Sequence, residues 1–139
     1  MAIDIYVNFN GNCREAVEFY AMAFNAEKQQ IMTFQDAPPD PQFPVSEEMK
    51  NLVLHTFLKI NGSTIMFSDV PPGMPFTAGN NITLVYSSNN MEEMKTIFYK
   101  LKEGGTVEMD LQETFWSKCY GSVKDKFGIG WQLSYHEAE

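Results

Sequence analysis

His55 is the side chain whose type best suits acid–base chemistry. The sequence contains two histidines, and only His55 lies well inside a strand-like run, since His136 is close to the C-terminus. An imidazole with an ordinary pKa of about 6.5 can accept or donate a proton near neutral pH. His55 is therefore a candidate general acid or base. The alternative is a structural histidine whose hydrogen bonds are satisfied within the sheet.

Glu113 and Trp116 are a second pair with chemical potential, in the run Gln112-Glu113-Thr114-Phe115-Trp116. A tryptophan beside an acid can stack on a planar or cationic ligand and orient it. Glu113 is also a candidate catalytic partner of His55, as is Asp4. The alternative is that Trp116 belongs to the core and Glu113 to its rim.

A hairpin must position His55. The dipeptide Asn61-Gly62 between two apolar runs predicts a two-residue turn, which fixes the pairing of the strands on either side. One face of this hairpin is apolar enough to pack under a helix. The other face is mixed, which is typical of a small-molecule pocket. It carries Lys59 with Thr64, Phe57 with Met66, and His55 with Ser68.

The first and last strands extend this mixed face. Residues 3–9 alternate apolar with polar side chains, the pattern of a half-buried strand. The apolar set Ile3, Ile5, Val7 and Phe9 is assigned to the helix side, and the polar set to the His55 side. In the last strand Gln132 lies on the corresponding side. The candidate ligand-binding residues are therefore Asp4, Tyr6, Asn8, Phe57, Met66, Ser68, Trp116 and Gln132.

The elements that carry these residues occur twice. Asn12 with Glu15 predicts a capped helix that ends near Phe24 and buries Ala16, Phe19, Tyr20 and Ala23, and Asn90 with Glu93 predicts another that ends near Glu103. Phe98-Tyr99 repeats Phe19-Tyr20. A strand precedes each helix (3–9 and 82–86), and three strand-like runs follow it, at 27–35, 52–60 and 63–69 and again at 106–113, 117–124 and 129–136.

This repeat predicts an α+β fold of two βαβββ modules within one domain, residues 1–75 and 76–139. The alternative is an ordinary α+β domain whose symmetry is accidental. Two loops interrupt the pattern, a proline-rich segment at 36–44 and a linker at 70–79. Whether segment 36–44 closes over a site as a lid is left open.

Composition excludes several classes of partner. The 139 residues carry a net charge of −8, which repels phosphate backbones and favours a neutral or cationic ligand. No apolar run reaches the roughly 20 residues that span a bilayer, and no signal-peptide pattern opens the chain. Cys13 and Cys119 lack any paired spacing, which is typical of reduced thiols. We therefore expect a cytoplasmic protein that binds neither nucleic acid nor membrane.

The chain resembles the PhnB-like branch of the vicinal-oxygen-chelate superfamily, often labelled 3-demethylubiquinone methyltransferase-like. The superfamily includes glyoxalase I, bleomycin-resistance proteins and extradiol dioxygenases. The resemblance covers nearly the whole chain, and His55 falls where that branch carries a histidine. The matching segments are 8–13 running into Glu18-Phe19-Tyr20, 62–69, Gln112-Glu113-Thr114-Phe115-Trp116, Asp125-Lys126-Phe127-Gly128 and Trp131. The resemblance implies a curved, largely antiparallel sheet around a cup, commonly completed in a homodimer.

The resemblance also implies where a metal would be held. Glyoxalase-type members place ligands on the first and last strands of each module, and the corresponding positions here are Asp4 or Ile5, Met66, Asn81 and Gln132. Divalent metals prefer imidazole, thiolate or carboxylate. Only Asp4 is a good ligand among these, so we expect no metal and no other cofactor.

Three functions remain open at this point. The first is a metal-free binding protein of the bleomycin-resistance type, with an aromatic or cationic ligand held in the cup. The second is an enzyme on a small metabolite, with His55 as general acid or base and Glu113 or Asp4 as its partner. The third is a structural or regulatory dimer whose cup has no ligand.

Overall fold

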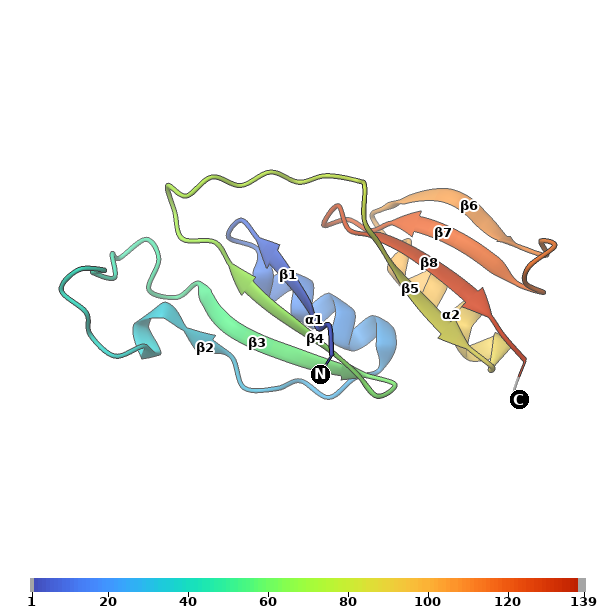
Figure 1. The fold of residues 1–139 in the computed structure, drawn as a ribbon, viewed down its shortest axis with the longest axis horizontal. Helices are drawn as coiled ribbons and strands as arrows, with labels where there is room; N and C mark the ends of the chain where they lie inside the picture. Colours follow the sequence, from blue (N-terminus) through green and yellow to red (C-terminus); the bar gives the residue numbers. More distant parts are fainter. Residues whose placement is uncertain (1, 138–139) are drawn as a thin grey trace. The chain divides into compact units, whose positions relative to one another are not determined.

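The computed structural model describes residues 2–137. The chain divides after Phe76 into two compact units, here the N-terminal and the C-terminal unit. Each unit follows the order strand, helix and three strands, and each forms its own four-stranded sheet (Figure 1). The predicted α+β fold with two βαβββ modules is confirmed. Each sheet has one parallel and two antiparallel strand pairs, so its character is largely antiparallel, as expected.

The N-terminal unit contains β1 (Ile5–Phe9), α1 (Cys13–Phe24), β2 (Met32–Thr33), a short 3-10 helix η1 (Phe34–Asp36), β3 (Val53–Ile60) and β4 (Ser63–Asp69). Its strands lie in the order β1-β4-β3-β2, with β1 parallel to β4. The C-terminal unit contains β5 (Thr83–Ser88), α2 (Met91–Leu101), β6 (Thr106–Gln112), β7 (Tyr120–Lys124) and β8 (Gly130–Tyr135). Its order is β5-β8-β7-β6, with β5 parallel to β8.

The hairpin between β3 and β4 has the predicted register. Ile60 pairs with Ser63, Leu58 with Ile65, Phe57 with Met66, and Thr56 with Phe67. Asn61 and Gly62 both have positive φ, 46° and 87°, as a tight turn that follows the twist of the strands requires. Because the register is set at the turn, the division of β3 and β4 into two faces follows directly from the sequence.

One helix covers one face of each sheet (Figure 1). In the N-terminal unit, α1 buries the four residues that were predicted for its inner side, and the Tyr20 ring stacks on Phe67 with centroids 5.8 Å apart. In the C-terminal unit, α2 packs on the corresponding face of its own sheet. The fully buried side chains there are Met94, Leu101, Val123 and Leu133, with Phe98 almost fully buried. Within each unit, no helix of residues 2–137 packs on the opposite face of its sheet.

Both helices are short and amphipathic. They contain 12 and 11 residues, and no helix among residues 2–137 is long and apolar enough to cross a bilayer. The two Phe-Tyr pairs of these helices are not buried to the same extent. Phe19, Tyr20 and Phe98 are buried, whereas Tyr99 is 59% exposed.

Three elements differ from their predicted bounds. The strand expected at 27–35 contains only Met32 and Thr33, because Asp36 bonds back to Thr33 and turns the chain into η1. The strand expected at 117–124 begins at Tyr120, because Ser117 is held in a turn with Thr114. The first strand begins at Ile5, so Ile3 lies outside the sheet and is 98% exposed, which makes its assignment to the helix side wrong.

Asn12 and Asn90 both occupy the predicted N-cap positions, but only the side chain of Asn90 caps its helix. Asn90 accepts a hydrogen bond from the Glu93 N–H at 3.0 Å. Asn12 makes no such bond. Asp69 replaces it, since its Oδ1 accepts the N–H groups of Gly11 and Cys13 at 2.9 and 3.0 Å. Asp69 can do this because it pairs with the last residue of β1, so its side chain reaches the start of α1.

Candidate functional site

The helix-free side of the N-terminal sheet gathers six of the residues proposed from the sequence. We call this set the N-terminal face. Its side chains come from the three longest strands, and the strand register places them on one side. The set consists of Tyr6 and Asn8 of β1, His55 and Phe57 of β3, and Met66 and Ser68 of β4. Asp4, the seventh proposed residue of this unit, precedes β1 and is exposed.

A tyrosine–histidine pair is the most reactive feature of the N-terminal face. The Tyr6 hydroxyl lies 3.1 Å from His55 Nδ1, and the two rings are 5.7 Å apart. The two residues lie on strands that flank β4, so their hydrogen bond passes over the strand that carries Met66. The bond fixes the orientation of the imidazole, which leaves Nε2 as the nitrogen available to a ligand. Tyr6 is 43% exposed, so the pair is open to solvent.

A second polar contact stands beside the first. The Ser68 hydroxyl donates to Asn8 Oδ1 at 3.1 Å. These two residues are direct partners in the β1–β4 register, two residues further along the strands than the pair of Tyr6 and Met66. Around both contacts lie the half-buried side chains of Phe57 and Met66. The N-terminal face therefore combines polar groups fixed by hydrogen bonds with apolar surface, as small-molecule sites do.

The helix-free side of the C-terminal sheet carries a chain of hydrogen bonds. The Tyr120 hydroxyl donates to Gln132 Oε1 at 2.7 Å, and Gln132 Nε2 donates to Thr83 Oγ1 at 2.9 Å. Gln132 was proposed from the sequence; Tyr120 and Thr83 were missed. The alternation in β7 could have revealed Tyr120, because the buried Gly121 and Val123 point to α2. We call Thr83, Thr106, Tyr120, Lys124 and Gln132 the C-terminal face.

Trp116 stands next to this face on a fixed turn. The Thr114 N–H bonds the Ser117 carbonyl, and the Ser117 N–H bonds the Thr114 hydroxyl. The Ser117 hydroxyl oxygen lies 2.8 Å from the carbonyl oxygens of both Cys119 and Tyr135, and its one hydrogen is directed to this pair of acceptors, which ties the turn to β8. Trp116 is 49% exposed and packs edge-to-face on Tyr120 at 5.2 Å. Trp116 is thus no core residue.

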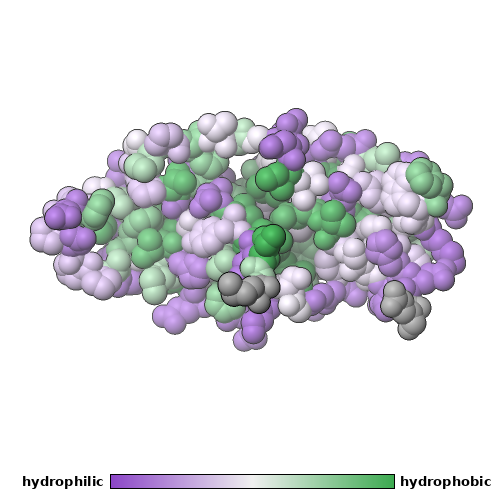
Figure 2. Space-filling view, viewed as in Figure 1, coloured by the Kyte–Doolittle hydropathy of each residue, from purple (hydrophilic) through white to green (hydrophobic). Residues whose placement is uncertain are grey.

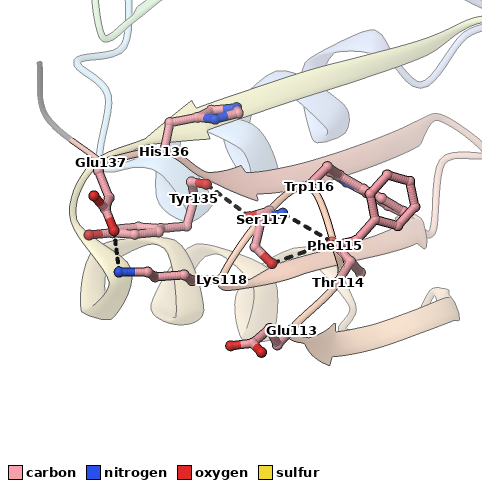
Figure 3. Close-up of a pocket in the computed structure, with 9 residues that line it drawn as sticks. All are labelled: Glu113, Thr114, Phe115, Trp116, Ser117, Lys118, Tyr135, His136 and Glu137. Carbon is pink, nitrogen blue, oxygen red and sulfur yellow. Dashed lines mark hydrogen bonds and ion pairs between the residues drawn. The ribbon is translucent and has the colours of Figure 1, made fainter.

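Glu113 lines a shallow hollow of about 280 Å³ beside this turn (Figure 3). Figure 3 shows its carboxylate directed away from the rings of Phe115 and Trp116. An ion pair between Lys118 and Glu137 closes another side of the hollow. The proposed partnership of Glu113 with His55 joins residues of two different units, whereas Tyr6 contacts His55 within one unit.

Of the four positions where a metal was expected from the resemblance, only the exposed Asp4 offers a good ligand. Met66 offers a thioether, and Asn81, which precedes β5, offers a neutral amide. Both polar atoms of the Gln132 amide are engaged with Tyr120 and Thr83. Divalent metals prefer imidazole, thiolate and carboxylate ligands. Among residues 2–137, no three His, Cys, Asp or Glu side chains gather closely enough to bind an ion.

The two cysteines do not qualify as nucleophiles. Both are buried and unpaired. Burial, together with the charge of Asp69, raises the pKa of the Cys13 thiol to about 12. Burial also raises the pKa of Cys119. A thiol reacts through its thiolate, and neither residue forms one readily near neutral pH.

Several large apolar side chains are exposed on the surface. Figure 2, in the same view as Figure 1, shows hydrophobic and hydrophilic residues mixed over the surface turned to the reader. The most exposed large apolar side chains include Ile3, Phe43, Ile82 and Phe115, each at least 74% exposed.

Comparison with known proteins gives one family. Residues 1–134 match the model of a family described as 3-demethylubiquinone-9 3-methyltransferase. Protein YjdN of Escherichia coli K12 is 34% identical over 141 residues, which cover 96% of this chain and 95% of that protein.

Solved structures give the same answer for the fold. Protein PA1353 from Pseudomonas aeruginosa has a TM-score of 0.85 at 29% identity, with 99% of both chains covered. A putative 3-demethylubiquinone-9 3-methyltransferase, PhnB protein, from Bacillus cereus has a TM-score of 0.74 at 28% identity, with 98% of this chain and 100% of that chain covered. The fosfomycin resistance protein FosX of Listeria monocytogenes shares the fold at 12% identity, with a TM-score of 0.64 and coverage of 96% and 91%.

Proposed function

We propose that this chain, which belongs to the 3-demethylubiquinone-9 3-methyltransferase family, is a metal-free protein that binds a small molecule on the helix-free side of its sheets. The PhnB-like resemblance is confirmed by these relatives, and family and fold together support small-molecule binding of the glyoxalase and bleomycin-resistance type. The ligand and the absence of a metal are the finer parts of the proposal.

The N-terminal face is the observation that carries this proposal. A stable protein buries its apolar side chains and leaves polar ones free to move in water. Here Tyr6 is instead bonded to His55, and the buried Ser68 to Asn8, on the helix-free side that also carries Phe57 and Met66. Groups that are already fixed lose little conformational entropy when a ligand arrives, which favours affinity.

An aromatic or cationic ligand suits these surfaces best. Tyr6 and Trp116 each expose close to half of their side-chain surface, at 43% and 49%. Exposed aromatic rings attract planar groups by stacking and cations through their negative faces. The net charge of −8 adds a general attraction for cations.

The methyl transfer in the family's description is not part of the proposal. A methyl-donor site of the usual kind needs a glycine-rich loop between a buried parallel strand and a helix. The two strand-to-helix turns here read Asn10-Gly11-Asn12 and Asn89-Asn90. The metal is omitted because three of the four expected ligand positions, Met66, Asn81 and Gln132, offer poor donors.

A titration with small aromatic cations tests the proposal. Benzylamine and benzyltrimethylammonium are added while amide NMR spectra are recorded, with benzoate as the anionic control. Saturable shifts are expected at Trp116 and at residues of the N-terminal face, stronger for the cations. Replacing Tyr6 by Ala should weaken binding several-fold, whereas Tyr99→Ala, at an exposed tyrosine on α2, should not. Equal effects of the two variants would remove the N-terminal face from the proposal.

Acid–base catalysis is the second candidate, and the Tyr6–His55 hydrogen bond favours it. An imidazole oriented by a hydroxyl is suited to move a proton at its other nitrogen. If the protein turns over a bound metabolite, His55→Gln should abolish turnover while binding persists. Turnover that survives in this variant would leave the binding function alone.

A homodimer is also part of the proposal, as is common among proteins of this architecture. Light scattering coupled to size exclusion measures the mass directly, against the 15.9 kDa of one chain. A dimer that binds none of the probes would favour the structural or regulatory role.

A further inference from the structure

A second hollow, of about 410 Å³, opens at one end of the C-terminal face. Its floor is a complete rung of the sheet, in which Thr83, Gly130, Lys124 and Thr106 lie side by side on four strands. We propose that this hollow binds a small zwitterion, with its anionic group at Lys124 and Thr83 and its ammonium group at Glu108. The inference rests on the proposed function, since it names the ligand class of one helix-free side.

The hydrogen-bond chain of the C-terminal face ends at this hollow. Tyr120 donates to the Gln132 carbonyl oxygen, and the Gln132 amide donates to Thr83 Oγ1. Thr83 therefore receives a hydrogen bond and keeps its own hydroxyl hydrogen to donate. No acceptor for that hydrogen occurs among residues 2–137 in the structure. Successive hydrogen bonds in one direction polarise each other, so the last donor is strengthened towards an anionic acceptor.

Two opposite charges line the same hollow. Lys124 contributes an ammonium group and Glu108 a carboxylate, and both side chains are exposed. Neither of these two side chains forms an ion pair with another residue of the part of the chain that the structure describes. A ligand with one charge of each sign can satisfy both groups at once.

The glycine in the rung provides the space. A Cβ built at Gly130 would stand 2.9 Å from Thr83 Cγ2, closer than real side chains approach. Thr83 can therefore lean over Gly130 only because no side chain is there. The result is a recess between Thr83 on β5 and Lys124 on β7, which a substituent at Gly130 would fill.

Net charge favours a zwitterion over a simple anion. The chain carries −8, so a free anion must approach against the field of the whole protein. A zwitterion has no net charge and meets no such barrier, while each of its ends still forms a charge-assisted hydrogen bond.

A series of ω-amino acids measures the ligand class. Glycine, γ-aminobutyrate and ε-aminocaproate vary the distance between the two charges, with butyrate and butylamine as controls that keep one charge each. Amide NMR titrations up to about 50 mM detect even weak, millimolar binding. One member of the series should shift the signals of Thr83, Thr106, Lys124 and Gly130, and should bind at least about 10-fold more tightly than either control.

Two variants assign the contacts. Lys124→Met keeps an unbranched side chain without the ammonium group, and its loss of charge should raise the Kd of the best zwitterion about 10-fold or more. Glu108→Gln should weaken the zwitterion but leave butyrate unchanged. Lys28→Met, at an exposed lysine outside the C-terminal unit, makes the same change in net charge and should have no effect.

The outcomes separate this inference from the proposed function. If benzylamine binds and no ω-amino acid does, the zwitterion subsite is wrong and the binding function stands. If neither class binds, both are wrong. Zwitterion binding that responds equally to Lys124→Met and Lys28→Met would show a general charge effect and would also overturn the subsite.

Discussion

The two units share one strand order but hold it in place with different polar groups. In the N-terminal unit, Asp69 at the end of β4 accepts N–H groups from the start of α1 and, through Oδ2, from Val53 at the start of β3. In the C-terminal unit, α2 is capped by its own Asn90, and the buried carboxylate belongs to Asp125 in the turn between β7 and β8. A repeated topology therefore does not require repeated anchors.

The difference follows from what each carboxylate must satisfy. Asp69 joins three segments that are distant in sequence, and it is 3% exposed. Asp125 is equally buried, but Phe127 and Ile129, which donate to its Oδ1, belong to its own turn, and the Trp131 indole N–H donates to its Oδ2 at 2.9 Å. Asp69 therefore connects segments that are distant in sequence, whereas Asp125 mainly stabilises its own turn.

The helix-free sides differ in the same way. The N-terminal face holds a tyrosine–histidine pair that can move a proton. The C-terminal face holds a hydroxyl–amide–hydroxyl chain that ends in donors. The proposed acid–base role depends on the first arrangement and the proposed recognition of an anionic group on the second, so the two proposals can be tested separately.

Replacing Asp69 should give the largest effect on stability. Asp69→Ala leaves two buried N–H groups and one part-buried N–H group without their acceptor, which we expect to cost about 3 to 5 kcal/mol of unfolding free energy. Urea denaturation measures it. Asp4→Ala, at an exposed aspartate of the same unit, should stay within about 0.5 kcal/mol. Equal stability of the two variants would contradict the role of Asp69 as an anchor.

Asp125→Asn should have a smaller effect, about 2 kcal/mol, because an amide oxygen still serves part of the turn. Trp131→Phe removes the indole donor from the other side. If the Asp125–Trp131 bond is the main tertiary contribution, the double variant should cost clearly less than the sum of the two single ones. Additive losses in urea denaturation would show that the two side chains act independently.

The two asparagine caps give the most direct test of the comparison. Asn90→Ala removes a formed cap and should cost about 1 kcal/mol, whereas Asn12→Ala should cost no more than about 0.5 kcal/mol. Both residues occupy the same position in the repeat, so the same substitution serves as its own control. Similar losses at both positions in thermal and urea unfolding would mean that Asn12 caps α1 after all.

Most of the fold follows from the sequence, because it depends on local signals. The Asn61-Gly62 turn set the register of β3 and β4, and alternation placed Tyr6, His55 and Met66 on one face. The start of α1 was not predictable in this way. Its cap comes from Asp69, 56 residues after Cys13, and only the parallel pairing of β1 with β4 brings the two together.

The candidate site, like the fold, could be predicted from the sequence only in part. Side chains on one face can be grouped from strand period alone, but their contacts cannot. The Tyr6–His55 bond depends on how far each side chain leans over β4. Thr83 and Tyr120 were missed because a threonine and a tyrosine in strands are ordinary, and their importance comes from Gln132 between them.

The smallest expected effect lies in the segment where the two units differ most. The N-terminal unit has a two-residue β2 where the C-terminal unit has the seven-residue β6, and β2 stops where Asp36 accepts the Thr33 N–H and hydroxyl, both at 2.9 Å. These bonds, the backbone one first, hold the pKa of Asp36 below its ordinary value. Because the folded-state pKa is the lower one, the contribution to stability is present above the unfolded pKa and is lost as pH falls through the folded pKa.

Thr33→Val removes the hydroxyl donor and keeps the backbone N–H. The pKa of Asp36 should therefore rise part of the way towards its ordinary value, and NMR titration of the side-chain carboxyl measures this directly. Thr64→Val makes the same replacement on β4, away from Asp36, and should leave the titration unchanged. If Thr33→Val also leaves the titration of Asp36 unchanged, the hydroxyl contributes nothing to the turn. The early end of β2 would then depend on the backbone bond alone, and the contrast with β6 would lie in the main chain rather than in this side chain.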